Sequence, residues 1–170
     1  MKLIQKNLIS TSIMLLLFSG LHAGFEKGDK EINFGFGLSH LSSDDSDSTS
    51  IAGNILYGYF QSENLELIGG INASHVDFDH GDSTAYGLTA GARWHFATSE
   101  SFVPFVGARI GYQRVESGSF EEDDFIYRGE GGFRQQINEN LTIDYIVSYE
   151  RSSELETNNF AFSIGFGIFL

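Results

Sequence analysis

The feature that most constrains the fold is a strict alternation of side-chain character over residues 159–170. Within this segment every second residue is large and apolar: Phe160, Phe162, Ile164, Phe166, Ile168 and Leu170. Alanine, serine and glycine occupy positions 161, 163, 165 and 167 between them. Side chains of an extended strand point alternately to its two faces, so the pattern predicts a β-strand with one apolar face. We expect this strand to pair with an earlier strand and to close a sheet.

The same period-two pattern recurs along the chain and predicts eight strands. They are expected at residues 31–41, 50–61, 65–76, 85–96, 102–115, 125–137, 141–151 and 159–170. Strands of about 11 residues at roughly 3.3 Å per residue, tilted by about 40°, span the apolar layer of an outer membrane. The connections alternate between long polar loops and short turns, as in transmembrane barrels. The expected fold is therefore all-β, an eight-stranded antiparallel up-and-down transmembrane β-barrel over residues 24–170.

Composition supports this fold and excludes several other classes. The chain has 20 glycines and one proline, which is typical of a β-protein with many turns. It has no cysteine, so it forms neither a disulfide nor a thiolate metal site. Its formal net charge of −13 at pH 7 argues against nucleic-acid binding, because phosphate groups are bound by Lys and Arg. No glycine-rich phosphate-binding motif occurs, and no cofactor is expected.

Residues 1–23 have the pattern of an export signal peptide. Lys2 and Lys6 provide a basic start, residues 13–18 an apolar centre, and residues 19–23 a small-residue end. The apolar run is shorter than the roughly 20 residues that a spanning helix requires. We expect cleavage after Ala23.

The period-two pattern alone does not say which face of the barrel is outside, because a soluble barrel of the lipocalin type turns its apolar face inward. Two observations favour the membrane alternative. No lysine occurs after Lys30, although a face in contact with water would be rich in lysine. The apolar set also carries aromatic residues near both ends of the strands, as expected for the two interfaces of a bilayer.

A few charged residues occur in the polar set, which then faces the lumen. If residues 138–140 form a three-residue turn, Arg134 lies opposite Asp144 and Arg128 lies opposite Glu150. Buried charges must be paired. We therefore predict a lumenal ion-pair network of Arg93, Arg109, Arg128, Glu130, Arg134, Asp144 and Glu150. Side chains can fill an eight-stranded barrel, so the network is expected to plug the lumen. A narrow porin-like channel is the alternative.

The export signal, the eight alternating strands and the aromatic final strand together resemble the small outer-membrane β-barrel proteins, a group that includes the OmpA transmembrane domain, OmpX, Ail and opacity-type proteins. The resemblance implies a place in the outer membrane of a Gram-negative cell, contact with outer-membrane lipid and lipopolysaccharide, and recognition of the C-terminal strand by the barrel-assembly machinery. The family usually ends in Phe, whereas here Leu170 is last and Phe169 lies on the other face. We expect a monomer with a structural or cell-surface interaction role and no enzymatic activity.

An enzymatic alternative rests on His40 and Ser42. The outer-membrane lipid A deacylases resemble this chain in size and barrel type, and they use a His-x-Ser pair with an acid. In that family the pair lies far later in the chain, and no acid partner can be assigned here. A lipid A-modifying activity is therefore the second alternative.

The predicted long loops are rich in carboxylates and are expected at the cell surface. Solvated loops that repel like charge are one interpretation, and binding of Ca²⁺ or Mg²⁺ is the other. The residues concerned are Asp44, Asp45, Asp47, Asp77, Asp79, Asp82, Glu116, Glu121, Glu122, Asp123, Asp124, Glu154 and Glu156.

Overall fold

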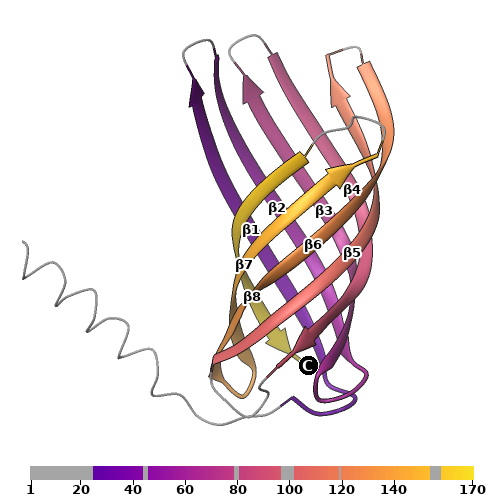
Figure 1. Cartoon of the computed structure of the whole chain (residues 1–170), viewed down its shortest axis with the longest axis vertical. Coiled ribbons are helices and arrows are strands. Elements are labelled where there is room, and N and C mark those ends of the chain that lie inside the picture. The colour runs from indigo at the N-terminus through magenta and orange to yellow at the C-terminus, as the bar shows by residue number, and fades with distance from the viewer. Residues whose placement is uncertain (1–24, 44–45, 79–80, 97–101, 119, 154–157) are drawn as a thin grey trace, which may run out of the picture.

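The chain forms a closed antiparallel barrel of eight strands (Figure 1). The computed structural model describes residues 25–43, 46–78, 81–96, 102–118, 120–153 and 158–170. The strands are β1 (Lys30–Ser43), β2 (Ser46–Phe60), β3 (Leu65–Phe78), β4 (Gly81–His95), β5 (Phe102–Ser117), β6 (Phe120–Asn138), β7 (Leu141–Ser152) and β8 (Asn158–Phe169). No helix within the described ranges is long and apolar enough to cross a membrane. The predicted fold class is confirmed.

The final strand closes the barrel as predicted. Residues Glu31–Phe36 of β1 pair with Ile164–Phe169 of β8. Each of the other strands pairs with its neighbours in sequence. The amphipathic C-terminal segment therefore finds its partner at the opposite end of the sequence.

The predicted register between β6 and β7 is confirmed, because Arg134 lies opposite Asp144 and Arg128 opposite Glu150. The predicted three-residue turn is wrong in detail. Asn138 pairs with Leu141, so the turn has two residues, and the register shifts between Gln136 and Asn138. A β-bulge absorbs one residue in this way and leaves the register beyond it intact.

Three of the four predicted long loops are mostly strand. The ladder of β5 and β6 continues to Ser117 opposite Phe120, and that of β3 and β4 continues to Phe78 opposite Gly81. Backbone hydrogen bonds do not depend on side-chain polarity, so a hairpin extends into water where its side chains are solvated. The connection between β7 and β8 is the longest of the four, since β7 ends at Ser152 and β8 begins at Asn158.

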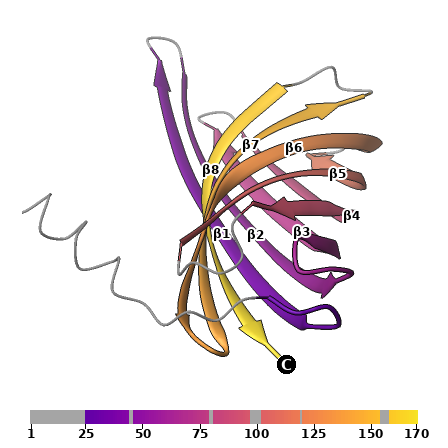
Figure 2. The same cartoon turned by 60° about the horizontal axis from the view of Figure 1, so that its bottom comes forward.

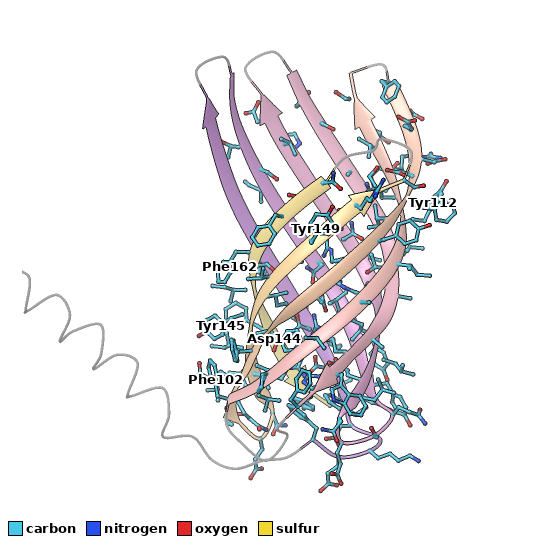
Figure 3. The ribbon with its side chains drawn as sticks, viewed as in Figure 1. Phe102, Tyr112, Asp144, Tyr145, Tyr149 and Phe162 are labelled. Carbon is cyan, nitrogen blue, oxygen red and sulfur yellow. The ribbon has the colours of Figure 1, made fainter. Side chains whose placement is uncertain are left out.

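The outer wall is apolar and exposed, while the lumen is polar and buried. Leu88 and Ile110 on the outside are 64% and 65% exposed, whereas Arg93 and Arg134 inside are completely buried. In Figure 3, Phe102, Tyr145 and Phe162 project from the outer edge of the barrel. A soluble barrel has the opposite arrangement. The structure therefore favours the membrane alternative.

Glycines on the lumenal face make room for the charged side chains. A Cβ atom at Gly107 would lie 3.0 Å from Cγ of Arg93 and 3.3 Å from Cγ of Glu130. A Cβ atom at Gly58 would overlap the carboxylate of Glu66. The small residues opposite the long side chains therefore allow the interior of a narrow barrel to be filled.

Candidate functional site

The lumenal cluster of charged side chains is centred on Arg134 of β6. Its Nε and Nη2 atoms donate to the two carboxylate oxygens of Asp144 at 2.7 and 2.8 Å. Nη2 also donates to Oε1 of Glu31 at 2.7 Å, and Nη1 lies 3.6 Å from Oε2 of Glu66. One guanidinium thus joins carboxylates from β1, β3 and β7 across the lumen.

A second layer of the cluster is built around Glu130, which also lies on β6. Its two carboxylate oxygens accept hydrogen bonds from Nε of Arg93 at 2.6 Å and from Nη2 of Arg109 at 2.5 Å. Arg93 connects the layers, because its Nη1 donates to Oδ2 of Asp144 at 3.2 Å. Charge-assisted hydrogen bonds of this kind are about twice as strong as neutral ones. These hydrogen bonds form a network across the lumen that links β4, β5, β6 and β7.

Sequence reasoning missed several members of this cluster. Nε2 of His95 lies 2.9 Å from Oε2 of Glu66, and Nδ2 of Asn33 donates to Oδ2 of Asp144 at 3.0 Å. Glu31 and Glu66 are also absent from the predicted set, although both are completely buried. The signal for them was available, because both lie in the polar alternation of strands with apolar neighbours.

The charges of the cluster nearly balance. Among the described residues, the guanidinium groups of Arg93, Arg109 and Arg134 meet the carboxylates of Glu31, Glu66, Glu130 and Asp144. One proton, on His95 or on a carboxyl group, makes the cluster neutral. A buried ionic network needs such balance because unpaired charge is costly away from water.

Arg128 and Glu150, the remaining two residues of the predicted network, form a separate pair above the cluster. Nε and Nη2 of Arg128 donate to Oε2 of Glu150 at 2.8 and 2.5 Å. Their side chains are 20% and 16% exposed. The structure thus places all seven predicted residues in the lumen but divides them into a buried cluster and a partly solvated pair.

An aromatic cap lies between the cluster and the mouth of the barrel that carries the β2–β3, β4–β5 and β6–β7 connections. Phe25, which precedes β1, stacks on Phe60 at 4.7 Å and on Phe169 at 5.8 Å between ring centroids. Its ring also lies 5.5 Å from the guanidinium carbon of Arg134. The sequence pattern around Phe25 is polar, so sequence reasoning missed this cap. The inward position of Phe169, which differs from the family pattern, places that ring in the cap.

The lipid A-modifying alternative rests on two residues of β1. His40 and Ser42 belong to β1, but their side chains lie outside the described part of the chain. Among the acidic residues, Asp44, Asp45, Asp79, Glu154 and Glu156 also fall outside the described ranges. Within those ranges, no three His, Asp or Glu side chains are grouped so that they could hold a metal ion.

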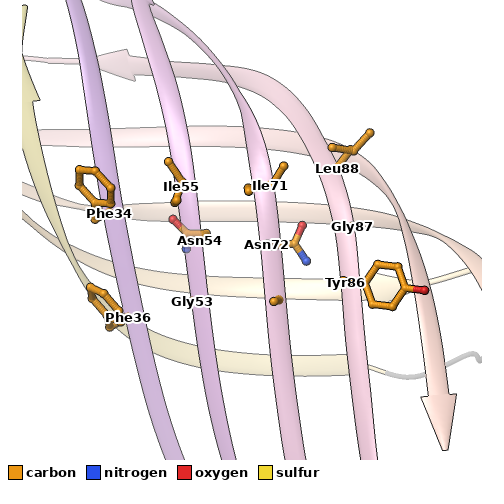
Figure 4. Close-up of a pocket in the computed structure, with 11 residues that line it drawn as sticks. Phe34, Phe36, Gly53, Asn54, Ile55, Ile71, Asn72, Tyr86, Gly87 and Leu88 are labelled. Atoms are coloured by element: carbon orange, nitrogen blue, oxygen red, sulfur yellow. The ribbon is translucent and has the colours of Figure 1, made fainter.

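The outer wall carries a broad hollow of about 610 Å³ over β1 to β4 (Figure 4). Phe36, Ile55, Tyr86 and Leu88 are among its apolar lining residues. The ladders between these strands are continuous behind it. The hollow is therefore a depression in the lipid-facing surface and does not lead into the lumen.

Comparisons with known structures agree with this fold. Neisserial surface protein A is 16% identical, with a TM-score of 0.64, and the match covers 82% of this chain and 96% of that one. OprG of Pseudomonas aeruginosa is 17% identical, with a TM-score of 0.63 and coverage of 86% and 98%. The Yersinia pestis attachment invasion locus protein Ail, in complex with the heparin analogue sucrose octasulfate, is 17% identical, with a TM-score of 0.56 and coverage of 86% and 100%. At these identities the matches show the fold alone.

A search of curated proteins finds no match. The model of the outer membrane protein beta-barrel domain family, however, matches residues 11–168, which is nearly the whole chain. The match agrees with the apolar outer wall and the charged lumen described above. The chain therefore belongs to the outer membrane protein beta-barrel domain family, and its place is the outer membrane.

Proposed function

We propose that this protein is a non-enzymatic outer-membrane barrel that does not conduct and that acts through its hairpins at the cell surface. The observation that carries the proposal is the filled lower lumen. Arg93, Arg134 and Asp144 are completely buried there, and Phe25 and Phe60 pack together in the aromatic cap beside them. A water-filled path would leave such side chains solvated.

The route to the membrane forms part of the proposal. Residues 1–23 act as an export signal that is removed, and β8 is the segment that the barrel-assembly machinery recognises. The barrel is a monomer whose apolar wall contacts lipid and lipopolysaccharide. The hairpins β1–β2, β3–β4 and β5–β6 carry the acidic segments and lie at the end of the barrel opposite the aromatic cap, so we propose that they face the outside of the cell.

The charge of these hairpins points to the kind of partner. Asp77, Asp82 and Glu121 are exposed on β3, β4 and β6. The structurally similar Ail has been crystallised with a heparin analogue, which is a polyanion. Carboxylates at the tips repel a polyanion, so we propose cationic surfaces as partners of this chain. Electrostatic steering of that kind weakens as salt is added.

Single-channel recording tests the closed lumen. The mature barrel is reconstituted into planar bilayers, and its folding is verified by heat-modifiable mobility on gels. We expect no steady conductance at a salt concentration at which a trimeric porin, recorded in the same bilayers, conducts. Stable unitary steps would contradict the proposal and support the narrow-channel alternative.

Binding to charged polymers tests the surface role. Folded barrels in neutral nanodiscs are exposed to polylysine and to heparin at low and at high salt. We expect binding of polylysine that high salt removes, and no binding of heparin. A matched variant with Asp82 and Glu121 changed to Asn and Gln is expected to bind polylysine less. Equal binding of both polymers would refute the assignment.

A further inference from the structure

The hollow over β1 to β4 arises where two small residues lie side by side on the outer wall. The strands that carry it follow one another around one side of the barrel (Figure 2). Gly53 of β2 lies opposite Ala73 of β3, and the rings of Phe36 and Tyr86 flank the two in the same row. Figure 4 shows these rings on either side of Gly53. At about 610 Å³, the hollow has the size of a ligand pocket, for which about 300–1,000 Å³ is typical.

The packing of the barrel does not require the glycine at position 53. A Cβ atom built there has an ordinary contact of 3.8 Å with the carbonyl oxygen of Gly35. At Gly70 on the lumenal face of β3, by contrast, a Cβ atom would overlap the backbone of Ile55. A glycine inside a strand weakens it and often marks a place where a ligand approaches the backbone closely. The fold therefore leaves room at position 53 that an occupant can fill.

One end of the hollow is apolar and the other end is polar. Toward the aromatic cap its lining residues are Ile55, Ile71 and Leu88. Toward the hairpins it is lined by Tyr86, whose hydroxyl group donates to Oε1 of Glu116 at 2.7 Å. A tyrosine with its ring among apolar residues and its hydroxyl group in a polar region is typical of a membrane interface. An amphiphile in the hollow therefore places its acyl chain along the apolar end and its head group at the Tyr86 end.

The polar end of the hollow carries an excess of negative charge. Among the described residues, Glu116 has no ion-pair partner. It lies directly opposite Glu121 of β6, and like charges in this position repel each other. Arg114, which lies opposite Tyr86, is already bound through two nitrogens to Asp123. The charge at this end disfavours an anionic head group and favours one that brings positive charge to Glu116.

We propose that this hollow binds a membrane lipid whose head group carries a primary ammonium group. An acyl chain of the lipid lies over Gly53 and Ala73, between the rings of Phe36 and Tyr86. The ammonium group donates to Oε2 of Glu116, while Oε1 keeps its hydrogen bond from the tyrosine. Such a charge-assisted hydrogen bond is stronger than one between neutral groups. The site uses the wall of the barrel, so it depends neither on the partner of the hairpins nor on the closed lumen.

Lipid retention in native mass spectrometry tests the proposal. The mature barrel is released from detergent in the presence of equal amounts of phosphatidylethanolamine, phosphatidylcholine and phosphatidylglycerol with identical acyl chains. We expect one molecule of phosphatidylethanolamine to be retained in preference to the other two lipids. The quaternary ammonium group of phosphatidylcholine has no N–H to donate, and phosphatidylglycerol is anionic. Equal retention of the three lipids, or a preference for either of the other two, would overturn the proposal.

Two variants that fill the hollow test its place in the site. Gly53→Leu and Ala73→Leu each put a side chain into the hollow, and each is expected to lose the preference for phosphatidylethanolamine. Folding is verified by heat-modifiable mobility, and the second variant serves where the first does not fold. The matched control is Gly129→Leu on the outer wall of β6, where nothing lies within 4 Å of a Cβ atom, and it is expected to keep the preference. A preference that survives in a folded variant with a filled hollow would refute the site.

Glu116→Gln tests the contact with the head group. The variant keeps an acceptor for the hydroxyl group of Tyr86 and removes the negative charge, so it is expected to retain phosphatidylethanolamine and phosphatidylcholine equally. Glu139→Gln removes the same charge from an exposed position between β6 and β7, at the other end of the barrel, and is expected to keep the preference. A Glu116→Gln barrel that still prefers phosphatidylethanolamine would overturn the assignment of the ammonium group to Glu116.

A phosphatidylethanolamine with a diazirine in the middle of one acyl chain locates the bound lipid. The probe is added to vesicles that contain the mature barrel, and the labelled residues are mapped by mass spectrometry after illumination. We expect labelling to concentrate on Ile55, Ile71 and Leu88. Val147, which is exposed on the outer wall of β7, is expected to be labelled little. Uniform labelling around the barrel would refute a specific site and indicate ordinary contact with the bilayer.

Discussion

Replacing Arg134 by Met is expected to cause a large loss of stability. The substitution removes two hydrogen bonds to Asp144 and one to Glu31, and it leaves these carboxylates buried. Breaking a buried pair by removing one partner costs about 3–5 kcal/mol, because the remaining charge is uncompensated. More than one carboxylate is left here, so we expect a loss of unfolding free energy toward the upper end of that range.

Urea unfolding in lipid vesicles measures this loss, with tryptophan fluorescence and gel mobility as readouts. The matched control is Arg114→Met. Arg114 also binds a carboxylate with two nitrogens, that of Asp123 at 2.7 and 3.0 Å, but the pair is exposed. Exposed pairs contribute little to stability, so this variant is expected to behave almost as the natural protein does. A loss for Arg134→Met no larger than that for Arg114→Met would refute the view that the cluster is desolvated and holds the strands together.

Two further predictions concern the register and the walls of the barrel. Arg128→Glu and Glu150→Arg are each expected to destabilise the barrel by roughly 1–3 kcal/mol in urea unfolding, because each leaves an unpaired charge. The double exchange is expected to restore much of the lost stability. Equal losses from all three variants would contradict the pairing. Gly132→Ala is expected to lower the free energy of unfolding by about 1–3 kcal/mol, because its Cβ atom would overlap the carbonyl oxygen of Tyr145. Gly129→Ala is the control, since nothing lies within 4 Å of a Cβ atom at Gly129. If Gly129→Ala is as destabilising as Gly132→Ala in the same assay, close approach of the backbone is not the reason for glycine at position 132.

The outer wall could be predicted from the sequence because the side to which each residue points depends only on its position within its own strand. A residue that faces lipid needs only to be apolar, and its contacts across the barrel do not affect this requirement. Tyr86, Tyr112 and Phe125, for example, are exposed on the outer wall, as their parity predicts. The pairing of Arg134 with Asp144 was also accessible, because a tight turn between consecutive strands fixes their register.

The lumen could be predicted only in part, because its contacts connect residues far apart in the sequence. Arg134 and Glu31 are 103 positions apart, and no single hairpin relates them. Arg134 on β6 and Glu31 on β1 come into contact only because the barrel closes and its strands are staggered relative to one another. Phe25 presents the same difficulty, since it precedes the first strand and belongs to no alternating pattern. The lengths of the hairpins were mispredicted because a polar composition does not end a backbone ladder.

The position of Phe25 fixes where the start of the folded chain leaves the barrel. With cleavage after Ala23, Phe25 is the second residue of the mature protein, and its ring packs against Phe60 and Phe169. A reporter fused ahead of Phe25 therefore emerges at the end of the barrel that carries the aromatic cap, which is the periplasmic end in the orientation that we propose. An epitope that antibodies must reach on intact cells belongs instead at the tip of the β1–β2 or β5–β6 hairpin. Labelling studies of this protein can use the two ends of the barrel as independent markers of its orientation in the membrane.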